Sequence, residues 1–549
     1  MKKYTSFLIC NVIILAACLL PIQKAYSQEN FIGTWQGVFM NDFDMLISFD
    51  GDDQGNIKMM AGTTIIQNDK ITDVKLTHNT FTFYIPDKET PFKGSFNEAF
   101  TELTGEFIFP DGQKHAIQLK RKIEEANLSE VFRATKENKF KAAELHTDLL
   151  FLYSSLKEHH PQLYAFTSVD SMSIILDSIK HKLIDGLTLE KSYLVLSQLT
   201  DVVKCSHTGI RLPIKYQDLA NEFGNYFPLR LYFKDAKAFL ISGNSIGKLG
   251  ISPGDEIISI NNMPIGKIIE QLFILIPSEG CNVTTKYNEL NKRFNSLFYF
   301  LDDSEEFIVT YKEGAATKTI SVSSSTFEGI SSKEGDMQNQ SPITFDYMDN
   351  RTFGVIKVSS FSIRNMDHYF KQLDSIFNDL KTTNTNNLIL DLRDNAGGHP
   401  IFAAQLFSYL TQKDFTYFKR NEEVKEFEPL YNIMQPNKLN FNGNTFFFVN
   451  GGCLSTTGHL ISLLKFNTNA IFIGEAPGST YRCNDFSMQL TLPNTGIELN
   501  VPRTTFETAV TGFNMCDPFP IDYEVDNSVI KIINNEDEYL EIVRAIHDK

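Results

Sequence analysis

The stretch FFFVNGGCLSTTGHLISLLK at residues 446–465 decides the fold class of the C-terminal part of this chain. It reads as a buried apolar strand, a Gly-rich turn, a serine and then a helix. A strand that turns sharply into a helix exposes a side chain at the turn, while the first backbone N–H groups of the helix stay free. We therefore predict that Ser455 is a nucleophile with oxyanion donors beside it.

Strands and helices alternate around this stretch from residue 343 onward. The pattern predicts strands at 353–358, 387–393, 445–449 and 470–474, and helices at 366–381, at 400–412 and directly after Ser455. Such alternation is typical of an α/β layer with a mostly parallel sheet, in which reactive groups gather at the carboxyl ends of the strands. We assign residues 343–549 to this α/β core.

A second Gly-rich turn follows the strand before it, in the sequence DLRDNAGG at residues 391–398. Glycine allows the backbone to adopt positive φ and to approach a ligand closely. We expect an N–H of Gly397 or Gly398, together with that of Thr456, to hold a developing oxyanion, and losing one such donor typically costs about 3 kcal/mol. A phosphate-binding turn is the alternative, but neither a lysine nor a GxGxxG pattern accompanies it.

Other polar groups near these turns have plainer interpretations. Asp391 and Arg393 are expected to hold their turn as an ion pair. Glu475, in the polar turn after the strand at 470–474, either shapes the substrate pocket or accepts structural hydrogen bonds. His399 follows the two glycines and could line the site.

A base must take the proton of Ser455, and histidine or lysine is the residue type for this task. Between Lys465 and Lys531 the chain has no lysine, so the following strands offer none to a Ser–Lys dyad. His459 would point along its own helix and away from the hydroxyl. His207 stands in a polar Cys-Ser-His-Thr-Gly turn between a predicted helix and a predicted strand. We predict His207 as the base, with an ordinary turn histidine as the alternative.

The rest of the chain divides into three predicted parts and a linker. Residues 28–124 alternate with the two-residue period of strands and predict an antiparallel β module, either lipocalin-like or a sandwich. Residues 125–222 have helical spacing and end near the His207 turn. Residues 223–322 read as short strands and contain KLGISPGDEIISINNMPI, which resembles the PDZ domain, a module that binds chain ends by adding a strand to a sheet edge. Residues 323–342 read as a linker.

Residues 1–27 are interpreted as a secretory signal. Lys2 and Lys3 precede an apolar run that is short for a membrane anchor, and small residues follow at the spacing of a cleavage site. We therefore expect an exported protein, periplasmic or secreted. The motif LAAC ending at Cys18 resembles a bacterial lipobox, so an outer-membrane lipoprotein is the alternative, and the membrane is a partner only in that case.

Charge and cysteine content narrow the function further. The formal net charge is −16, and it becomes −19 when residues 1–27, with three lysines and no acid, are removed. So acidic a chain argues against nucleic acid as a partner. Five cysteines remain outside the signal, and an odd number so widely spread does not indicate a disulfide framework. Zinc-binding spacing such as CxxC is absent from the sequence. We expect no metal and no organic cofactor.

Taken in order, these motifs resemble the C-terminal processing (tail-specific) serine peptidase family, which includes the tricorn protease core. The resemblance covers roughly residues 140–530 and rests on the His207 turn, the PDZ-like turn, the DLRDNAGG turn, Ser455 before its helix and the Gly-Glu turn at Glu475. It implies a crotonase/ClpP-like core. Because the catalytic lysine of the processing peptidases is missing, it implies the tricorn-like branch, in which Ser206 orients His207 and Ser455 attacks.

Two further expectations concern an assisting carboxylate and a pair of cysteines. The tricorn-like branch uses an assisting Glu, and we choose Glu507, one of the acids nearest to the segment that looks like the family's closing motif. Cys205 and Cys453 each lie two residues before a proposed catalytic residue. If Ser455 meets His207, those two sulfurs lie near one another, and a disulfide between them is a hypothesis.

These observations predict an exported serine endopeptidase, or a peptidase directed at carboxyl ends, that acts through an acyl-enzyme on Ser455. Its partner is a peptide or protein substrate, which the PDZ-like module would capture or admit. Two alternatives remain: a catalytically inactive peptide- or ligand-binding protein on the same scaffold, and an esterase-type acyl hydrolase.

Overall fold

The computed structural model describes residues 31–40, 43–49, 54–61, 64–77, 80–97, 100–122, 125–243, 246–330, 341–420, 424–517 and 519–548. The chain forms two compact units, Met1–Glu130 and Val131–Lys549, and each is described by itself. The predicted signal with Cys18, and residues 331–340 of the predicted linker, lie outside the described residues.

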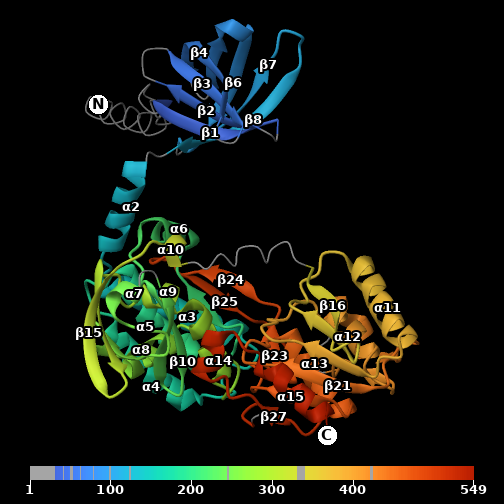
Figure 1. The fold of residues 1–549 in the computed structure, drawn as a ribbon. Coiled ribbons are helices and arrows are strands. Elements are labelled where there is room, and N and C mark those ends of the chain that lie inside the picture. The colour runs from blue at the N-terminus through green and yellow to red at the C-terminus, as the bar shows by residue number, and fades with distance from the viewer. Residues whose placement is uncertain are drawn as a thin grey trace, which may run out of the picture. The chain divides into compact units, whose positions relative to one another are not determined.

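The first unit contains a closed barrel of eight antiparallel strands in sequence order (Figure 1). In β5 the alternate residues Phe81, Phe83 and Ile85 are buried inside, as a two-residue period dictates. β1 pairs with both β2 and β8, which closes the barrel. The predicted antiparallel β module is confirmed, as a barrel and not a sandwich. Its elements are β1 (Gly33–Phe39), β2 (Phe43–Phe49), β3 (Gly55–Ala61), β4 (Thr64–Thr77), β5 (Thr80–Ile85), η2 (Pro86–Lys88), β6 (Thr90–Phe96), β7 (Glu102–Ile108) and β8 (Lys114–Lys122).

Helices dominate the segment that follows the barrel. In α3, Leu145, Leu149, Leu152 and Leu156 recur every three or four residues and are all buried, so the helical spacing read from the sequence is confirmed. The elements are α2 (Glu125–Glu137), α3 (Ala142–His159), α4 (Val169–Lys182), α5 (Leu189–Asp201), β9 (Gly209–Arg211) and α6 (Ile214–Phe223). The turn that carries His207 connects α5 to β9.

The next segment is an antiparallel sheet with the order β10-β11-β12-β14-β15, and β13 pairs with β12. The expected short strands are present, and the segment also contains the helices α8 and α9, which the strand interpretation of the sequence omits. In α8, Ile265, Ile268, Ile269 and Leu272 are buried at helical spacing, a period that the strand interpretation overlooked. The elements are β10 (Leu229–Lys234), β11 (Lys237–Gly243), α7 (Ile246–Leu249), β12 (Glu256–Ile260), β13 (Met263–Pro264), α8 (Ile265–Phe273), α9 (Thr284–Phe298), β14 (Glu306–Glu313), β15 (Ala316–Ser323) and α10 (Phe327–Ile330).

Helix α9 covers the outer edge of β10. Asn291 accepts a hydrogen bond from the N–H of Phe233 and donates one to its carbonyl oxygen. Asn295 donates to the carbonyl oxygens of Phe227 and Leu229. A peptide joins a sheet edge through free backbone groups. The carbonyl oxygens of Phe227 and Leu229 and both backbone groups of Phe233 are therefore already occupied by side chains of α9.

The α/β core is a sheet with the order β16-β17-β18-β21-β22-β27, parallel except for the β16–β17 pair. The predicted mostly parallel sheet is thus confirmed. Leu388, Leu390 and Phe447 pack against α11, α12 and α13, while Ile389 and Phe448 pack against α15. Alternate residues of these strands therefore pack against helices on opposite faces of the sheet, whose elements are labelled in Figure 1. The elements are β16 (Ile343–Met348), β17 (Phe353–Val358), α11 (Met366–Thr382), β18 (Asn387–Asp391), α12 (Pro400–Ser408), β21 (Asn444–Val449), α13 (Thr456–Asn467), β22 (Ile471–Gly474), β27 (Tyr523–Glu524), α14 (Val529–Asn534) and α15 (Glu538–His547).

Small sheets connect the core to the helical segment. β25 pairs with β24 on one side and with β9 on the other, and β23 pairs with β26. The buried carboxylate of Asp148 on α3 accepts hydrogen bonds from the backbone and side chains of Asn494 and Thr495, in the turn between β24 and β25. The elements are β19 (Phe415–Thr416), η4 (Lys425–Tyr431), β20 (Ile433–Met434), β23 (Arg482–Asp485), β24 (Met488–Thr491), β25 (Glu498–Val501) and β26 (Thr504–Glu507).

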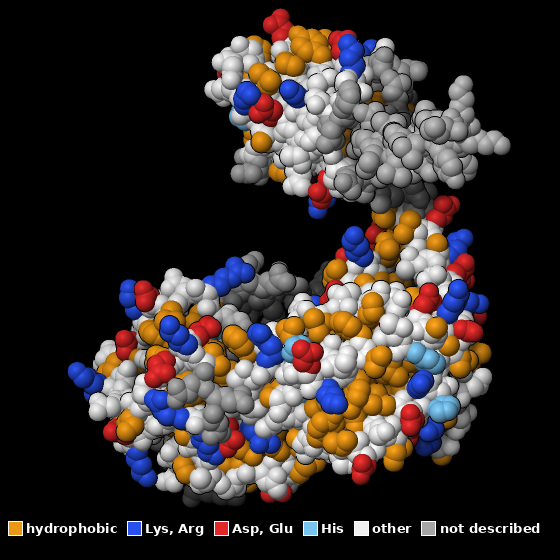
Figure 2. Space-filling model, turned by 180° about the vertical axis from the view of Figure 1, so that it is seen from behind, with side chains coloured by type: hydrophobic (Ala, Val, Ile, Leu, Met, Phe, Trp, Pro, Cys, Tyr) orange, Lys and Arg blue, Asp and Glu red, His pale blue; other side chains and the backbone are white. Residues whose placement is uncertain are grey.

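Two surface properties bear on partners. Among the described residues, no helix has the length and apolar content to cross a membrane. On the face shown in Figure 2, basic and acidic side chains are interspersed and form no broad basic patch.

Candidate active site

Ser455 lies at the sharp turn between β21 and α13, where the sequence predicts the nucleophile. Its backbone has φ of +52° and ψ of −123°, a combination that residues with a Cβ rarely adopt and that costs roughly 1–3 kcal/mol. The residue caps the N-terminus of α13, so the free N–H groups of the first helical turn lie beside it. A serine held in a strained strand-to-helix turn is the arrangement that nucleophile elbows use.

The DLRDNAGG turn packs directly against this serine. A Cβ added to Gly397, whose φ is +100°, would lie 2.9 Å from Cβ of Ser455 and 3.0 Å from N of Thr456. The hydroxyl of Thr456 donates to the carbonyl oxygen of Gly398. The residues predicted to form the oxyanion hole are thus brought together, and glycine is required at 397 because the backbones approach so closely.

One predicted donor needs correction. The N–H of Gly397 donates to Oδ1 of Asn395 at 2.9 Å, and this bond is buried. The same asparagine donates to the carbonyl oxygen of Val358 and so fixes the turn. The N–H of Gly397 is therefore committed to the turn itself. Gly398 and Thr456 stay as the predicted donors.

His207 is one end of a hydrogen-bonded chain that runs through Ser206 to the carboxylate of Glu279. Nδ1 of His207 lies 3.2 Å from Oγ of Ser206. Ser206 donates to Oε2 of Glu279 twice, from its hydroxyl at 2.8 Å and from its backbone N–H at 3.1 Å. Asn500 of β25 donates to the carbonyl oxygen of His207 and holds the turn beside β9.

The direction of these bonds selects one tautomer of His207. An ionised carboxylate only accepts hydrogen bonds, so ionised Glu279 accepts the hydrogen bond that the hydroxyl of Ser206 donates. The oxygen of Ser206 then accepts from Nδ1–H of the imidazole. In the neutral ring this leaves Nε2 without a proton, and that nitrogen is the one available to act as a base.

Burial sets the charge states in this chain. It raises the pKa of Glu279 to about 7, against the hydrogen bonds from Ser206 and the charge of Arg482, which favour the ionised form. Burial also lowers the pKa of His207 from its usual range, opposed by the nearby Asp485. His207 is therefore neutral near pH 7, as a base must be.

Ser455 and His207 approach the same strand from distant parts of the sequence. Oγ of Ser455 lies 4.0 Å from Sγ of Cys483, and Nε2 of His207 lies 3.5 Å from Oδ2 of Asp485. Residues two apart on a strand share one face and are roughly 7 Å apart. The hydroxyl and the imidazole thus lie over the same face of β23. No direct hydrogen bond joins these two described residues, so the imidazole must turn away from Asp485 to reach the hydroxyl.

His459 is buried beneath this face and is not exposed to substrate. Its Nε2 lies 3.4 Å from Sγ of Cys483, and its ring packs edge-on against Phe418. Burial, together with the charge of His207, lowers the pKa of His459 to about 3. The ring is therefore neutral and contacts Cys483.

The assisting carboxylate expected at Glu507 is corrected by the structure. Glu507 lies on β26, and its carboxylate forms an ion pair with Lys419. Glu279 instead contacts Ser206, although it is distant in sequence and was not considered as a site residue. The sequence offers only a weak signal for it, a glutamate in a Pro-Ser-Glu-Gly turn between two helices.

The cysteine hypothesis is wrong as well. Cys205 and Cys453 are free and buried, and Cys453 donates to the carbonyl oxygen of Leu392 at 3.1 Å. Burial raises the pKa of Cys453 to about 12, which keeps it a thiol and unsuited to nucleophilic attack. The disulfide that the structure contains joins Cys281 to Cys516.

The remaining polar residues have structural contacts. Asp391 and Arg393 form the predicted ion pair at 2.7 Å, and Arg393 also contacts Asp537. Glu475 accepts a hydrogen bond from Asn527. His399 caps the N-terminus of α12. The part of the chain that the structure describes holds no group of three or more His, Cys, Asp or Glu side chains placed to bind a metal ion.

A cavity of about 250 Å³ opens beside the base. Ser206 and His207 line it, together with residues of β9 and β25 such as Arg211 and Glu498, which form an ion pair. Because β9 pairs with a strand on one side only, an extended chain in this cavity would lie beside a strand edge and next to the imidazole.

Comparisons with known proteins concern the fold of the core. Residues 352–509 match the model of peptidase family S41. Mature CPAF complexed with lactacystin is similar in structure with a TM-score of 0.53 at 12% identity, over 74% of this chain and 97% of that chain, which shows a shared fold. The photosystem II D1 C-terminal processing protease reaches a TM-score of 0.36 at 13% identity, over 72% of this chain and 98% of that chain. No sequence among the curated proteins matches the chain.

Proposed function

We propose that this protein, whose core at residues 352–509 belongs to the serine-type peptidases of family S41, is exported and cleaves peptide bonds through an acyl-enzyme on Ser455. The observation that carries the proposal is the chain from Glu279 through Ser206 to His207, which ends over the same face of β23 as the hydroxyl of Ser455. Each member of this chain supplies a group that acyl transfer needs.

In the proposed reaction, Nε2 of His207 takes the hydroxyl proton of Ser455 while Oγ attacks the carbonyl carbon of the scissile bond. The backbone N–H groups of Gly398 and Thr456 stabilise the oxyanion. The imidazolium then protonates the leaving amine. Water hydrolyses the acyl-enzyme in a second step, with His207 again as the base.

Glu279 acts through Ser206 in this proposal. As His207 becomes positively charged, Nδ1–H strengthens its bond to Oγ of Ser206, which in turn donates to the carboxylate. The negative charge therefore stabilises the imidazolium without contact with the substrate. Its role matches that of the buried aspartate in a Ser–His–Asp triad.

The substrate class is a peptide or protein, and recognition of its carboxyl end remains part of the proposal. The cavity beside His207 supports binding of an extended chain along β9. Capture by strand addition to β10 would have to displace Asn291 and Asn295 from the backbone groups of Leu229 and Phe233. Export is proposed from residues 1–27 alone, and N-terminal sequencing of the mature protein from cell fractions tests it.

Labelling with a fluorophosphonate probe tests the nucleophile. We expect the wild-type protein to be labelled and the Ser455→Ala variant to stay unlabelled. Ser462→Ala is the matched control, since Ser462 lies on the same helix and its hydroxyl donates to the carbonyl oxygen of Gly458. A folded wild-type protein without labelling would instead indicate a non-catalytic binding protein on this scaffold.

Turnover assays separate the remaining alternatives. His207→Gln should lower kcat/KM for a peptide substrate by about 100- to 10,000-fold, the usual contribution of a general base. His399→Gln, on the N-cap of α12, serves as the control. Turnover of esters without any turnover of peptides would favour an esterase-type acyl hydrolase.

A further inference from the structure

The segment that carries Glu279 is a short connection between α8 and α9, and it is held from two sides. On one side the N–H of Gly280 donates to the carbonyl oxygen of Lys204, three residues before His207. On the other side a Cβ at Gly280, whose φ is +60°, would lie 2.6 Å from the carbonyl oxygen of Met515. The segment thus passes between the His207 turn and the loop before β27.

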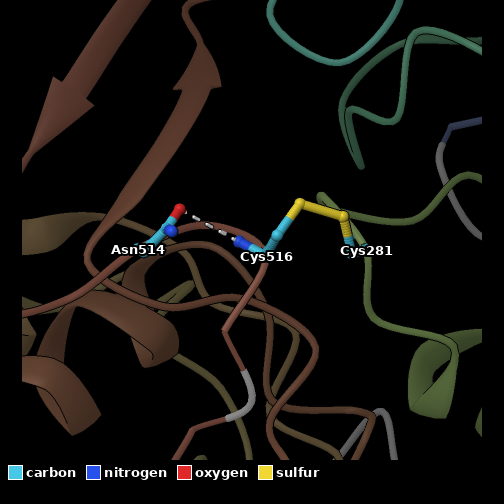
Figure 3. The surroundings of a disulfide bond; sticks show 3 residues. All are labelled: Cys281, Asn514 and Cys516. Carbon is cyan, nitrogen blue, oxygen red and sulfur yellow. Dashed lines mark hydrogen bonds between the residues drawn. A yellow bond between two sulfur atoms is a disulfide. The ribbon is translucent and has the colours of Figure 1, made fainter.

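A disulfide closes this second side. Cys281 and Cys516 are bonded, with a separation of 235 positions in sequence and Cα atoms 4.8 Å apart. Figure 3 shows the bond joining the segment next to Glu279 to the loop near the C-terminus, where the N–H of Cys516 donates to Asn514. Cys281 is two residues from Glu279, so the bond limits how far the carboxylate can move from Ser206.

This disulfide is open to solvent, unlike the thiols of the protein. Cys281 and Cys516 are both exposed, and they line a cavity of about 340 Å³ together with Glu279. The free cysteines of the described residues, Cys205, Cys453 and Cys483, are buried. A dithiol reductant from solvent can therefore reach the Cys281–Cys516 bond, and accessible disulfides are the ones that exchange readily.

We infer that the Cys281–Cys516 disulfide is a positioning element of the active site, which holds Glu279 against Ser206 in the oxidised protein and releases it on reduction. The inference rests on the proposed function, because it assigns the disulfide to the chain that orients His207. Two hydrogen bonds from Asn282 and Thr284 to the carbonyl oxygens of Pro477 and Ala476 keep the following residues in place, so release is local.

The redox step is an ordinary thiol–disulfide exchange. A thiolate of dithiothreitol attacks one sulfur of the bond and forms a mixed disulfide, and its second thiol then displaces the protein sulfur. Two electrons and two protons pass to the protein, which gains two thiols. The reductant becomes a cyclic disulfide.

The test compares the oxidised full-length protein, the same protein after dithiothreitol, and the Cys281→Ser/Cys516→Ser double variant. We expect reduction to lower kcat for a peptide by about 10- to 100-fold, as misplacement of a positioning group does. The double variant should be equally slow and should not respond to dithiothreitol. Reoxidation of the reduced wild-type protein should restore kcat.

Amide hydrogen exchange provides the readout that a general stabilising bond would not give. The N–H groups of Ser206 and Gly280 donate to Glu279 and Lys204, so reduction should remove their protection while the core sheet keeps its own. Unchanged protection and kcat after reduction would overturn the inference, and so would exchange that rises throughout residues 131–549.

Failure of the proposed function gives a different result. An oxidised protein that is neither labelled by fluorophosphonate nor active on peptides would refute the peptidase assignment. The amide protection of Ser206 and Gly280 would still decide whether the disulfide holds Glu279 in place.

Discussion

Replacing Glu279 with Gln should make the protein more resistant to unfolding at alkaline pH and, at the same time, a poorer enzyme. Gln keeps the shape of the side chain and an oxygen that accepts the two hydrogen bonds from Ser206. It removes the charge that burial disfavours. The same charge is the one that stabilises the imidazolium of His207 in the proposed reaction, so stability and activity should change in opposite directions.

The magnitude follows from the pKa. Burial raises the pKa of Glu279 from 4.5 to about 7. The folded state therefore binds this proton more tightly than the unfolded chain does. The stability that this group contributes is fully present below pH 4.5 and is lost as the pH rises through about 7. Because one pKa unit corresponds to about 1.4 kcal/mol, the loss amounts to about 3 kcal/mol by pH 8 to 9.

Unfolding of the wild-type protein and of Glu279→Gln by urea at pH 5, 6, 7, 8 and 9 measures this difference. We expect the variant to gain stability relative to wild type as the pH rises, by up to about 3 kcal/mol. Glu222→Gln is the control, since Glu222 is exposed on α6. In parallel, kcat/KM of the wild type should rise through about pH 7, and the variant should lack this rise.

Two results would refute this reasoning. A stability difference between wild type and variant that is the same at every pH would mean that Glu279 does not titrate with a raised pKa. Full activity of the variant, with the rise near pH 7 intact, would mean that the carboxylate plays no part in orienting His207. The first result removes the electrostatic argument, and the second removes the catalytic one.

Three further predictions test other parts of the site. Gly397→Ala should abolish fluorophosphonate labelling and lower the unfolding temperature, because a Cβ there would lie 2.9 Å from Cβ of Ser455 in a backbone with φ of +100°. Asp485→Asn should lower the pKa of His207 further in an NMR titration of the imidazole, because it removes the negative charge that opposes burial. Asp148→Ala should destabilise the protein by about 3 kcal/mol in thermal unfolding, because buried donors of the β24–β25 turn lose their acceptor.

The parts of the fold that local pattern encodes could be predicted from the sequence. The two-residue alternation of the first unit predicts strands, which form the barrel. The leucines at helical spacing predict a helix, and they form the buried face of α3. The apolar strand, Gly-rich turn and helix around Ser455 became the strained turn between β21 and α13. In each case the signal and the structure involve the same few consecutive residues.

The partners across the site could not be predicted in this way, because they depend on contacts between distant segments. Ser206 and Glu279 are 73 residues apart, and nothing in the local sequence of either marks the other. Glu507 was predicted for its place near the segment that resembles the family's closing motif, yet its carboxylate, on β26, contacts Lys419. The N–H of Gly397 is occupied because it donates a hydrogen bond to the side chain of Asn395. That contact depends on the conformation of Asn395, which composition does not reveal.

The disulfide and the raised pKa of Glu279 both concern the cost of keeping an ionised carboxylate buried beside Ser206. Placing an ionised carboxylate in a buried position disfavours the folded site by about 3 kcal/mol at alkaline pH. This cost favours conformations in which the side chain of Glu279 is exposed to solvent. The hydrogen bonds from Ser206 oppose this only in part, since the pKa remains raised. A crosslink between positions 235 apart in sequence stabilises the folded chain as a whole by about 5 kcal/mol, because it restricts the unfolded chain, and this gain does not act on one side chain. What opposes displacement of Glu279 is therefore local: the covalent bond fixes Cys281, two residues away, to the loop that carries Cys516, and the hydrogen bonds from Ser206 hold the carboxylate itself.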